Sequence, residues 1–416
     1  MNPRSFLLPG VVLAAAACQP GGDTHNNNTP PALIVALPRS LSASEQALIT
    51  ADNQLGFELL RAARAAAPDS NVLLSPLSAG MALGLTLNGS AGATLDSMRR
   101  ALQLSDMPVA TIDSGYRSLL DLLARLDGTT SFSIANSIWT DNSISFLASF
   151  LSAGKANFDA EIHNLDLQAP ATVGSINDWA SRKTKGMIPA IVSRIDPDEV
   201  MLLINAIAFK GEWRQGFDPA KTQPAPFTTS SGETQSVPTM TLGAVIGHAV
   251  KPDAELVELP YGDGAFALTI VLPAPGRSIG DLMNGLDAAR FAGWVSQIGD
   301  DDLVLTLPRF RFQFERQLND DLSALGMRVA FDRDAADFTR MATLAPPTRL
   351  YLTNVTQKTL VDVDEEGTTA AAVTSVGVAR GTSRLPEVDV DRPFLFVLRE
   401  RLSGTIFFVG QVNRIP

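Results

Sequence analysis

Hydrophobic side chains recur at helical spacing in the first half of the chain. From about residue 44, the apolar positions Leu48, Leu55 and Leu59 fall on one face of a helix that should end near Pro68. Ser44 is a candidate for the cap of this helix. Similar patterns predict further helical segments at 78–87, at 112–126 and from 173 to 179 onward.

Strand-like runs dominate the second half. Short segments rich in β-branched and aromatic residues predict strands at 200–209, 256–259, 265–272, 303–307, 310–314, 350–364, 394–398 and 405–409. Because helices come mostly first and strands mostly later, the order favours an α+β fold over the strict alternation of a parallel α/β fold. No linker or internal repeat interrupts residues 44–416, so we predict one large domain there.

The N-terminus has the pattern of an export signal. Arg4 precedes an apolar run that is too short to span about 30 Å of hydrocarbon, which predicts a signal peptide at 1–17. The run ends at Cys18 in a sequence that resembles a bacterial lipobox. Ala15 stands where leucine is usual, so cleavage without lipidation is the alternative. Residues 18–43 then form a flexible tether. We expect an exported protein, anchored to the cell envelope through a lipid on Cys18 or else secreted.

Composition places the chain among globular proteins and narrows its chemistry. Hydrophobic residues make up 45% of the chain and charged residues 19%. The 44 acidic and 33 basic side chains give a net charge of −11, which disfavours nucleic-acid partners. With one cysteine and three histidines, we predict no disulfide framework, no metal site and no cofactor.

One motif resembles an enzyme signature. Residues 276–280 match the Gly-x-Ser-x-Gly nucleophile elbow, with Ser278 as the nucleophile. In that fold the catalytic histidine follows the serine in the chain, yet His25, His163 and His248 all precede Ser278. We therefore predict that the chain is not an enzyme, and a Ser278 hydrolase is only a minor alternative.

The segment 367–378 has an unusual composition. It holds only uncharged side chains that are small or β-branched, whereas acidic residues precede it and Arg380 and Arg384 follow it. In a strand, the two-residue period would place on one face Thr368, Ala370, Ala372, Thr374, Val376 and Val378. Neither face carries a charge that would have to be desolvated, so the segment can enter a sheet. A plain strand or a linker is the alternative.

Several stretches of the chain, in order, resemble the serpin family. The most specific is 205–222, which includes Asn205, Phe209 and Trp213. The others lie at 71–98, 177–188, 307–338, 363–368 and 391–410. Together they cover nearly all of the chain after the tether. The resemblance implies a serpin fold with helices, a large central mixed sheet and smaller sheets, and an exposed reactive loop at about 365–386.

The resemblance implies an irreversible, suicide-type inhibitor of serine proteases. In serpins, the target protease cleaves the reactive loop, which then inserts into the central sheet and traps the acyl-enzyme. Small residues after Gly367 favour an inhibitor, because non-inhibitory members tend to carry charged or bulky residues there. The alternative is a non-inhibitory serpin that acts as a binding module or as a plain protease substrate. We expect a bacterial protein, monomeric, with a serine protease as its partner.

The resemblance also implies roles for individual residues. The hinge of the loop comprises Glu365, Glu366, Gly367, Thr368, Ala370, Ala371 and Ala372. The shutter beneath the sheet comprises Ser75, Ser78, Asn205 and Gln357, and Gln357 replaces the usual histidine. Trp213 marks the breach, where insertion starts. The candidates for the scissile position are Arg380, Gly381 and Thr382. Arg380 would suit a trypsin-like target, and the other two an elastase-like or subtilisin-like one.

Overall fold

The computed structural model describes residues 32–345, 348–368 and 385–416, which belong to one compact unit. Its α-helices are α1 (Ala43–Ala66), α2 (Pro76–Leu87), α3 (Gly92–Ala101), α4 (Val109–Leu123), α5 (Ala148–Phe158), α6 (Thr172–Lys183), α7 (Ile279–Met283), α8 (Ala288–Val295) and α9 (Asn319–Leu322). None of the helices in this described part is both long enough and apolar enough to cross a membrane. The mixture of helices and mainly antiparallel strands confirms the α+β class.

The first helix starts at a capping box. The Ser42 hydroxyl accepts a hydrogen bond from the Glu45 N–H (3.2 Å), and the Glu45 carboxylate accepts one from the Ser42 N–H (2.7 Å). The cap is therefore Ser42 and not Ser44, because only Ser42 has a glutamate at the position that closes the box. The preceding residues also contact the compact unit, since the Ile34 N–H donates to the Asp263 carbonyl at 2.8 Å. The unit thus includes part of the segment that the sequence assigns to a tether.

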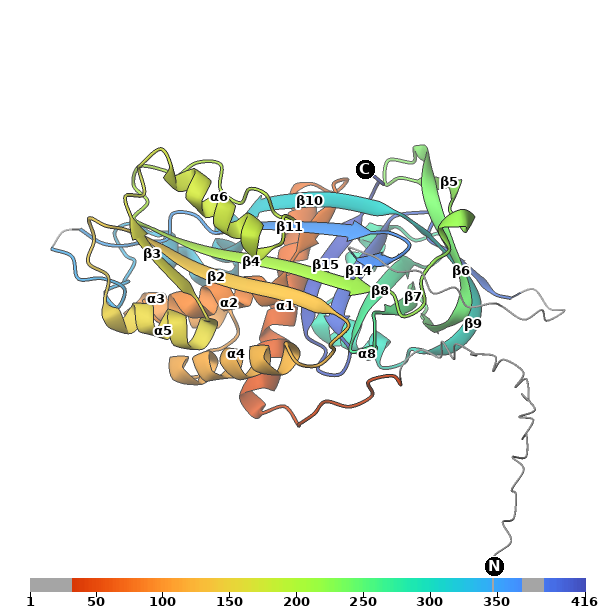
Figure 1. The fold of residues 1–416 in the computed structure, drawn as a ribbon, viewed down its shortest axis with the longest axis horizontal. Coiled ribbons are helices and arrows are strands. Elements are labelled where there is room, and N and C mark those ends of the chain that lie inside the picture. Colours follow the sequence, from red (N-terminus) through yellow and green to blue (C-terminus); the bar gives the residue numbers. More distant parts are fainter. Residues whose placement is uncertain (1–31, 346–347, 369–384) are drawn as a thin grey trace, which may run out of the picture. The chain divides into compact units, whose positions relative to one another are not determined.

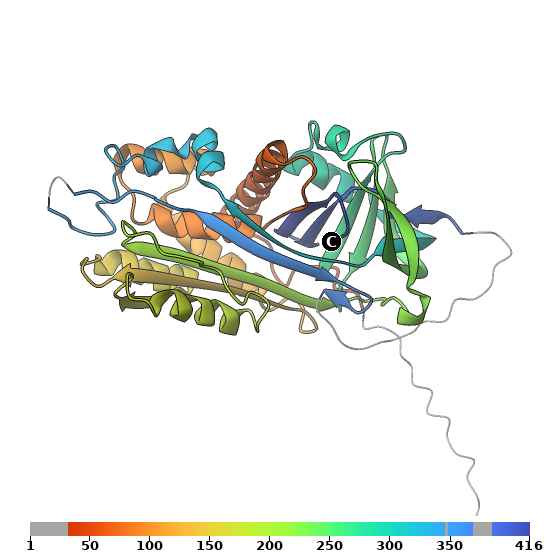
Figure 2. The same ribbon diagram turned by 90° about the horizontal axis from the view of Figure 1, so that it is seen from above.

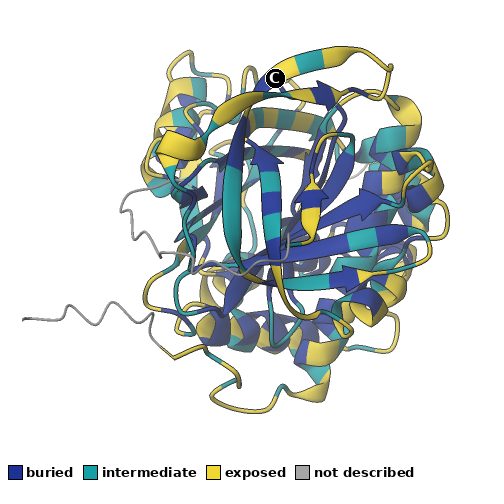
Figure 3. Ribbon diagram, turned by 90° about the vertical axis from the view of Figure 1, so that its right-hand side faces the viewer, coloured by how far each residue is buried: buried dark blue, intermediate teal, exposed yellow. Residues whose placement is uncertain are grey.

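One of the two sheets has nine strands within the described residues. Its order is β1-β15-β14-β8-β7-β6-β9-β13, with β5 paired to β6. The bounds are β1 (Val72–Leu74), β5 (Gln223–Thr228), β6 (Thr234–Val250), β7 (Ala254–Pro260), β8 (Phe266–Pro273), β9 (Gly299–Pro308), β13 (Glu387–Asp389), β14 (Phe394–Glu400) and β15 (Ile406–Val412). Every residue of β8, β14 and β15 is buried, and buried strands occupy the interior in Figure 3. These strands hold much of the hydrophobic core.

The second sheet has six strands in the described residues, in the order β10-β11-β12-β4-β2-β3. The bounds are β2 (Ser131–Asp141), β3 (Glu161–Leu165), β4 (Met201–Glu212), β10 (Phe310–Gln317), β11 (Thr356–Val363) and β12 (Gly367–Thr368). Helix α2 covers one face and α6 the other (Figures 1 and 2). Accordingly, odd-numbered β4 residues such as Asn205 face α2, whereas Ile204 and Ala206 pack with Trp179 of α6.

The strand predicted at 350–364 is shorter in the structure. Strand β11 begins only at Thr356, because the preceding backbone bonds to other elements. The Leu352 N–H donates to the Ala330 carbonyl at 2.9 Å. The Asn319 side chain donates to the Thr353 carbonyl (2.8 Å) and accepts from the Val355 N–H (2.9 Å). Residues 350–355 therefore run beside the sheet without forming a ladder.

Candidate functional site

The six-stranded sheet is incomplete between β4 and β11. Strand β12 lies between them and pairs antiparallel with both, through Thr368 opposite Gly211 on one side and opposite Val363 on the other. Beyond Thr368, no ladder joins β4 to β11 within the described residues. We call this unpaired boundary, flanked by residues 201–210 and 356–362, the strand gap. A strand that continued from β12 would run down it.

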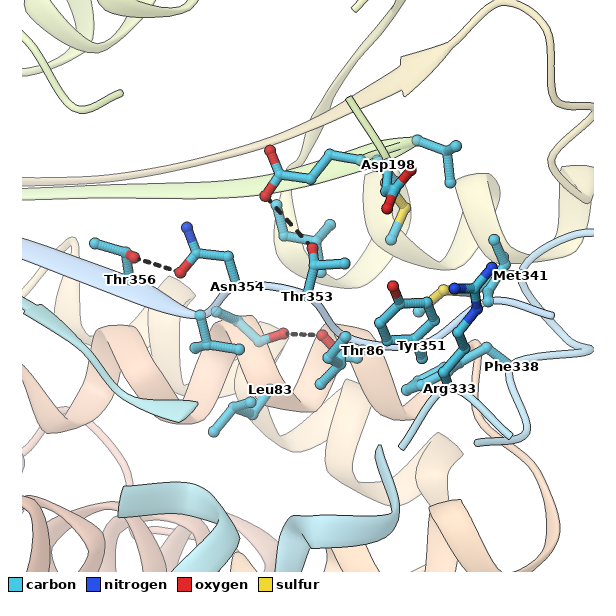
Figure 4. Close-up of a pocket in the computed structure, with 18 of the residues that line it drawn as sticks. Leu83, Thr86, Asp198, Arg333, Phe338, Met341, Tyr351, Thr353, Asn354 and Thr356 are labelled. Atoms are coloured by element: carbon cyan, nitrogen blue, oxygen red, sulfur yellow. Dashed lines mark hydrogen bonds between the residues drawn. The ribbon is translucent and has the colours of Figure 1, made fainter. Parts of the chain in front are cut away.

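The far end of the strand gap opens into a cavity of about 390 Å³. Leu83 and Thr86 of α2 lie at its floor, and Thr353, Asn354 and Thr356 line the β11 side (Figure 4). The cavity also reaches Met201 and Leu203 at the start of β4. The first residues of both flanking strands, β4 and β11, therefore line this cavity.

The start of the loop is held by an aromatic pair. The Trp213 N–H donates to the Glu366 carbonyl and its Nε1–H donates to the Asp364 carbonyl, both at 2.8 Å. The Trp213 ring stacks on Tyr261 at 4.5 Å, and the Tyr261 hydroxyl shares a hydrogen bond of 2.7 Å with the Thr368 hydroxyl. Burial raises the pKa of Tyr261, so this hydroxyl stays neutral. Contacts of Trp213 and Tyr261 thereby hold residues 364–368 in place.

Gly367 is required by a close backbone approach. Its φ of +149° lies in a region that side chains disfavour, and a Cβ atom there would lie 2.1 Å from the Gly211 carbonyl oxygen. Any larger residue would push the chain away from β4. Glycine at this position lets the hinge turn into the strand gap.

Side chains of the shutter bind α2 from both edges of the strand gap. On the β11 side, the Gln357 carboxamide accepts from the Ser75 N–H (2.9 Å) and donates to the Ser75 carbonyl (2.8 Å). On the β4 side, the Ser78 hydroxyl donates to Asn205 Oδ1 at 2.5 Å. The Asn205 amide in turn donates to Asn136 Oδ1 at 2.7 Å. The structure thus brings together all four predicted shutter residues and adds Asn136, which the sequence analysis missed.

Comparison with known proteins identifies the architecture. A family model described as serpin (serine protease inhibitor) matches residues 50–415. The chain belongs to the serpin family. Iripin-2 of Ixodes ricinus is 33% identical to this serpin over 384 residues, which cover 90% of this chain and 95% of iripin-2.

Solved serpin structures have the same fold. The thermophilic serpin tengpin, in its native state, superposes with a TM-score of 0.81 at 29% identity and covers 92% of this chain and 98% of its own. A thyroxine-binding globulin in complex with thyroxine gives a TM-score of 0.80 at 25% identity, with 88% and 99% covered. The predicted serpin fold is confirmed. The family is one of protease inhibitors, and the predicted family membership holds for nearly the whole domain.

Glu365 anchors the hinge of this serpin electrostatically. Its side chain is only 3% exposed, forms an ion pair with Arg309 at the start of β10, and accepts a hydrogen bond from the Thr222 hydroxyl. Burial raises the pKa of this carboxyl, but the Arg309 and Thr222 hydrogen bonds outweigh burial and leave the pKa below its ordinary value. The sequence analysis named Glu365 but neither of its partners, which lie 56 and 143 residues earlier in the chain.

Other predicted positions lie outside the described residues. These are Cys18, Ala370, Ala371, Ala372, Arg380, Gly381 and Thr382. Ser278 of the enzyme-like motif caps α7: its hydroxyl donates to Asp281 Oδ2 (2.7 Å) and accepts from the Asp281 N–H (3.1 Å). Among the residues that the structure describes, no group of three or more His, Cys, Asp and Glu side chains is placed to hold a metal ion.

Proposed function

We propose that this serpin is an irreversible inhibitor of serine proteases that traps its target by inserting the cleaved loop into the strand gap. The observation that carries the proposal is the placement of Gly367 and Thr368: both pair with β4, and Thr368 also pairs with β11. A loop released by cleavage can extend this ladder without a new nucleation step.

The register supports the fit of the loop. Continuing antiparallel from Thr368, Ala370 would lie opposite Phe209 and Val361, both nearly fully buried. Thr374 would lie opposite Asn205 and Gln357, the two shutter amides, where its hydroxyl can hydrogen-bond. Small or hydroxyl side chains at these positions match the buried, α2-facing side of the sheet.

The free energy expected from insertion is large compared with the effects of single contacts. About a dozen inserted residues, each gaining roughly 1 kcal/mol of net hydrogen bonding, would stabilise the molecule by about 10 kcal/mol. This is comparable with the stability of a whole domain. Insertion would therefore be irreversible on the timescale of protease turnover.

The scissile position would set the class of target. Cleavage after Arg380 implies a trypsin-like protease with an acidic specificity pocket, whereas cleavage after Gly381 or Thr382 implies an elastase-like or subtilisin-like protease. We propose a serine protease in either case, and a monomeric inhibitor.

The test is incubation with trypsin, elastase and subtilisin in turn. We expect a covalent complex that survives boiling in detergent with at least one of them, and a large rise in Tm of the nicked protein. Mass spectrometry of the released C-terminal peptide would identify the scissile bond. Cleavage without complex formation, and with no rise in Tm, would contradict the proposal.

A binding module is the second candidate. It is favoured by the similarity to a chain named for thyroxine binding, because one fold can carry unrelated functions. This candidate predicts that the protein is cleaved as a plain substrate and that a small molecule raises the Tm of the intact form.

We also propose that a signal peptide at 1–17 exports the protein and that Cys18 is acylated, as in bacterial lipoproteins. The support is the sequence around Cys18. Intact mass spectrometry of the mature protein would show the added acyl chains, and Cys18→Ser would abolish them. A mature form without acyl chains would indicate secretion.

A further inference from the structure

Glu199 is a buried carboxylate at the far end of the strand gap. It lies two residues before β4, lines the cavity there, and is 5% exposed. One of its oxygens accepts a hydrogen bond from the Asp196 N–H (3.0 Å), and the other accepts a longer one from the Thr353 hydroxyl (3.4 Å). Among the residues that the structure describes, no ion pair joins Glu199 to a cation. The carboxylate is therefore hydrogen-bonded but not neutralised.

The groups around Glu199 stabilise its charge only in part. Burial raises the pKa of this carboxyl, and the nearby charge of Asp196 raises it further. The two hydrogen bonds and the charge of Arg194 lower the pKa without cancelling burial. Arg194 is itself exposed and is paired with Asp196 at 3.3 Å. A buried anion in this state gains free energy when a cation binds beside it.

Buried apolar side chains form much of the remaining wall of the cavity. Leu83 of α2, Phe338 and Met341 all line it and are each at most 3% exposed. Figure 4 shows Phe338 and Met341 gathered with Tyr351 at one end of the cavity. The volume of about 390 Å³ lies within the range of small-molecule sites, which is about 300–1,000 Å³. The cavity can therefore hold a compact ligand with an apolar body.

The other charged residues that line the cavity are exposed to solvent. They are Asp198, Asp334, Arg333 and Arg349. Their formal charges cancel, and solvent and salt screen them. Glu199 is thus the buried charge that a ligand in this cavity would meet, and it favours a cation.

We propose that the cavity binds a small amphipathic amine, whose ammonium group pairs with Glu199 and whose apolar body packs against Leu83, Phe338 and Met341. The Thr353 hydroxyl, which lies 3.4 Å from one oxygen of the same carboxylate, can accept a second hydrogen bond from the ammonium group. A neutral ligand of the same shape would leave the carboxylate unpaired, and an anionic one would be repelled by it. This site belongs to the intact molecule and does not depend on cleavage or insertion of the loop.

The test compares three probes that share one apolar body and differ in charge. They are 3-phenylpropylamine, 3-phenylpropan-1-ol and 3-phenylpropionate, each titrated into the intact full chain at pH 7.5 by isothermal calorimetry. We expect the amine to bind at least about tenfold more tightly than the alcohol, because it forms a charge-assisted pair. The carboxylate probe should bind most weakly. The amine alone should raise the Tm of the intact protein clearly at millimolar concentration.

Two variants locate the charge that selects the amine. Glu199→Gln keeps the shape of the side chain and should reduce the amine to the affinity of the alcohol. Asp198→Asn removes the neighbouring exposed carboxylate and should leave all three affinities unchanged. Circular dichroism and thermal unfolding check that both variants are folded. If Glu199→Gln does not fold, Thr353→Val replaces it, and this variant should weaken the amine several-fold while leaving the alcohol unchanged.

Three results would overturn the inference. One is equal binding of the amine and the alcohol, or no binding of any probe at millimolar concentration. Another is an amine preference that persists in Glu199→Gln or, where that variant does not fold, an amine affinity unchanged in Thr353→Val. The third is an equal loss of the preference in Asp198→Asn, which would indicate attraction by surface charge in place of a buried pair. Each of these results leaves the proposed protease inhibition unaffected.

Discussion

The two sheets of this serpin differ in how far their central strands are paired on both sides. In the nine-stranded sheet, β14 has registered partners on both sides along its length, in β8 and β15. In the six-stranded sheet, β4 pairs with β2 along most of its length but with only Gly367 and Thr368 on the other side. The middle strands of one sheet are paired on both sides, whereas in the described residues of the other sheet no ladder joins β4 to β11 beyond Thr368.

The difference lies in what holds the strands. The nine-stranded sheet is held by continuous ladders between fully buried strands. At the strand gap, Gln357 of β11 and Asn205 of β4 hydrogen-bond to the first turn of α2 instead. Helix α2 therefore links the two strands, although they do not pair with each other there. An unpaired strand edge can accept a further strand, and β12 occupies the first positions between β4 and β11.

The largest expected effect comes from placing a charge where the sheet would be completed. In Ala370→Arg, insertion would bury a guanidinium opposite Phe209 and Val361 at a cost of several kcal/mol. We expect cleavage without any covalent complex on a denaturing gel. Thr369→Arg is the matched control, because residue 369 would face the partly exposed Asp362 and should still trap protease. Equal trapping by both variants would contradict the register.

The next effect concerns the entrance to the strand gap. Gly367→Ala places a Cβ atom against the Gly211 carbonyl and should force Thr368 out of the sheet, which lowers the stability of the intact protein by about 2–4 kcal/mol. Thermal unfolding measures the loss. Gly404→Ala is the control: Gly404 has a φ of +76° but nothing within 4 Å, so it tests backbone strain without a clash. A similar loss in both would assign the effect to backbone conformation alone.

The hydrogen bonds between Gln357 and Ser75, the cap of α2, predict a smaller effect on stability. Gln357→Ala leaves the buried Ser75 N–H without its partner and removes one of the two hydrogen bonds to the Ser75 carbonyl, and we expect a loss of about 1–3 kcal/mol in chemical unfolding of the intact form. The exposed Gln313 on neighbouring β10 serves as control, and Gln313→Ala should change stability by less than about 0.5 kcal/mol. An equally mild Gln357→Ala would show that α2 does not hold this edge.

The smallest effect is one of pH. Because the pKa of Glu365 is lowered in the folded protein, its ion pair with Arg309 contributes stability above the unfolded pKa of about 4.3, and this contribution is lost as pH falls through the lowered pKa. Between pH 7 and pH 3, Tm should therefore fall more for the unsubstituted protein than for Glu365→Gln. Glu366→Gln should follow the unsubstituted protein. Parallel curves for all three would mean that Glu365 adds nothing.

The sequence predicts features that depend on short stretches of chain better than contacts between residues that are far apart in the chain. Ser75, Ser78 and Asn205 sit in recognisable stretches, and the uncharged run after Gly367 can be read directly. The partners of the hinge cannot be read in this way, because Tyr261 meets Thr368 only across 107 residues of chain. The strand start at Thr356 was also missed, since Asn319 competes for the backbone of residues 353–355 and has no local signature.

Trp213 gives this protein a built-in optical reporter. Its indole N–H donates to the Asp364 carbonyl, immediately before the hinge. By contrast, Trp139 of β2 packs against Trp179 of α6, and Trp294 lies on α8. Departure of the hinge would alter the polarity around one of four indoles, so emission from the unlabelled chain can time loop movement in a stopped-flow instrument. Replacing the other three by phenylalanine would isolate that signal.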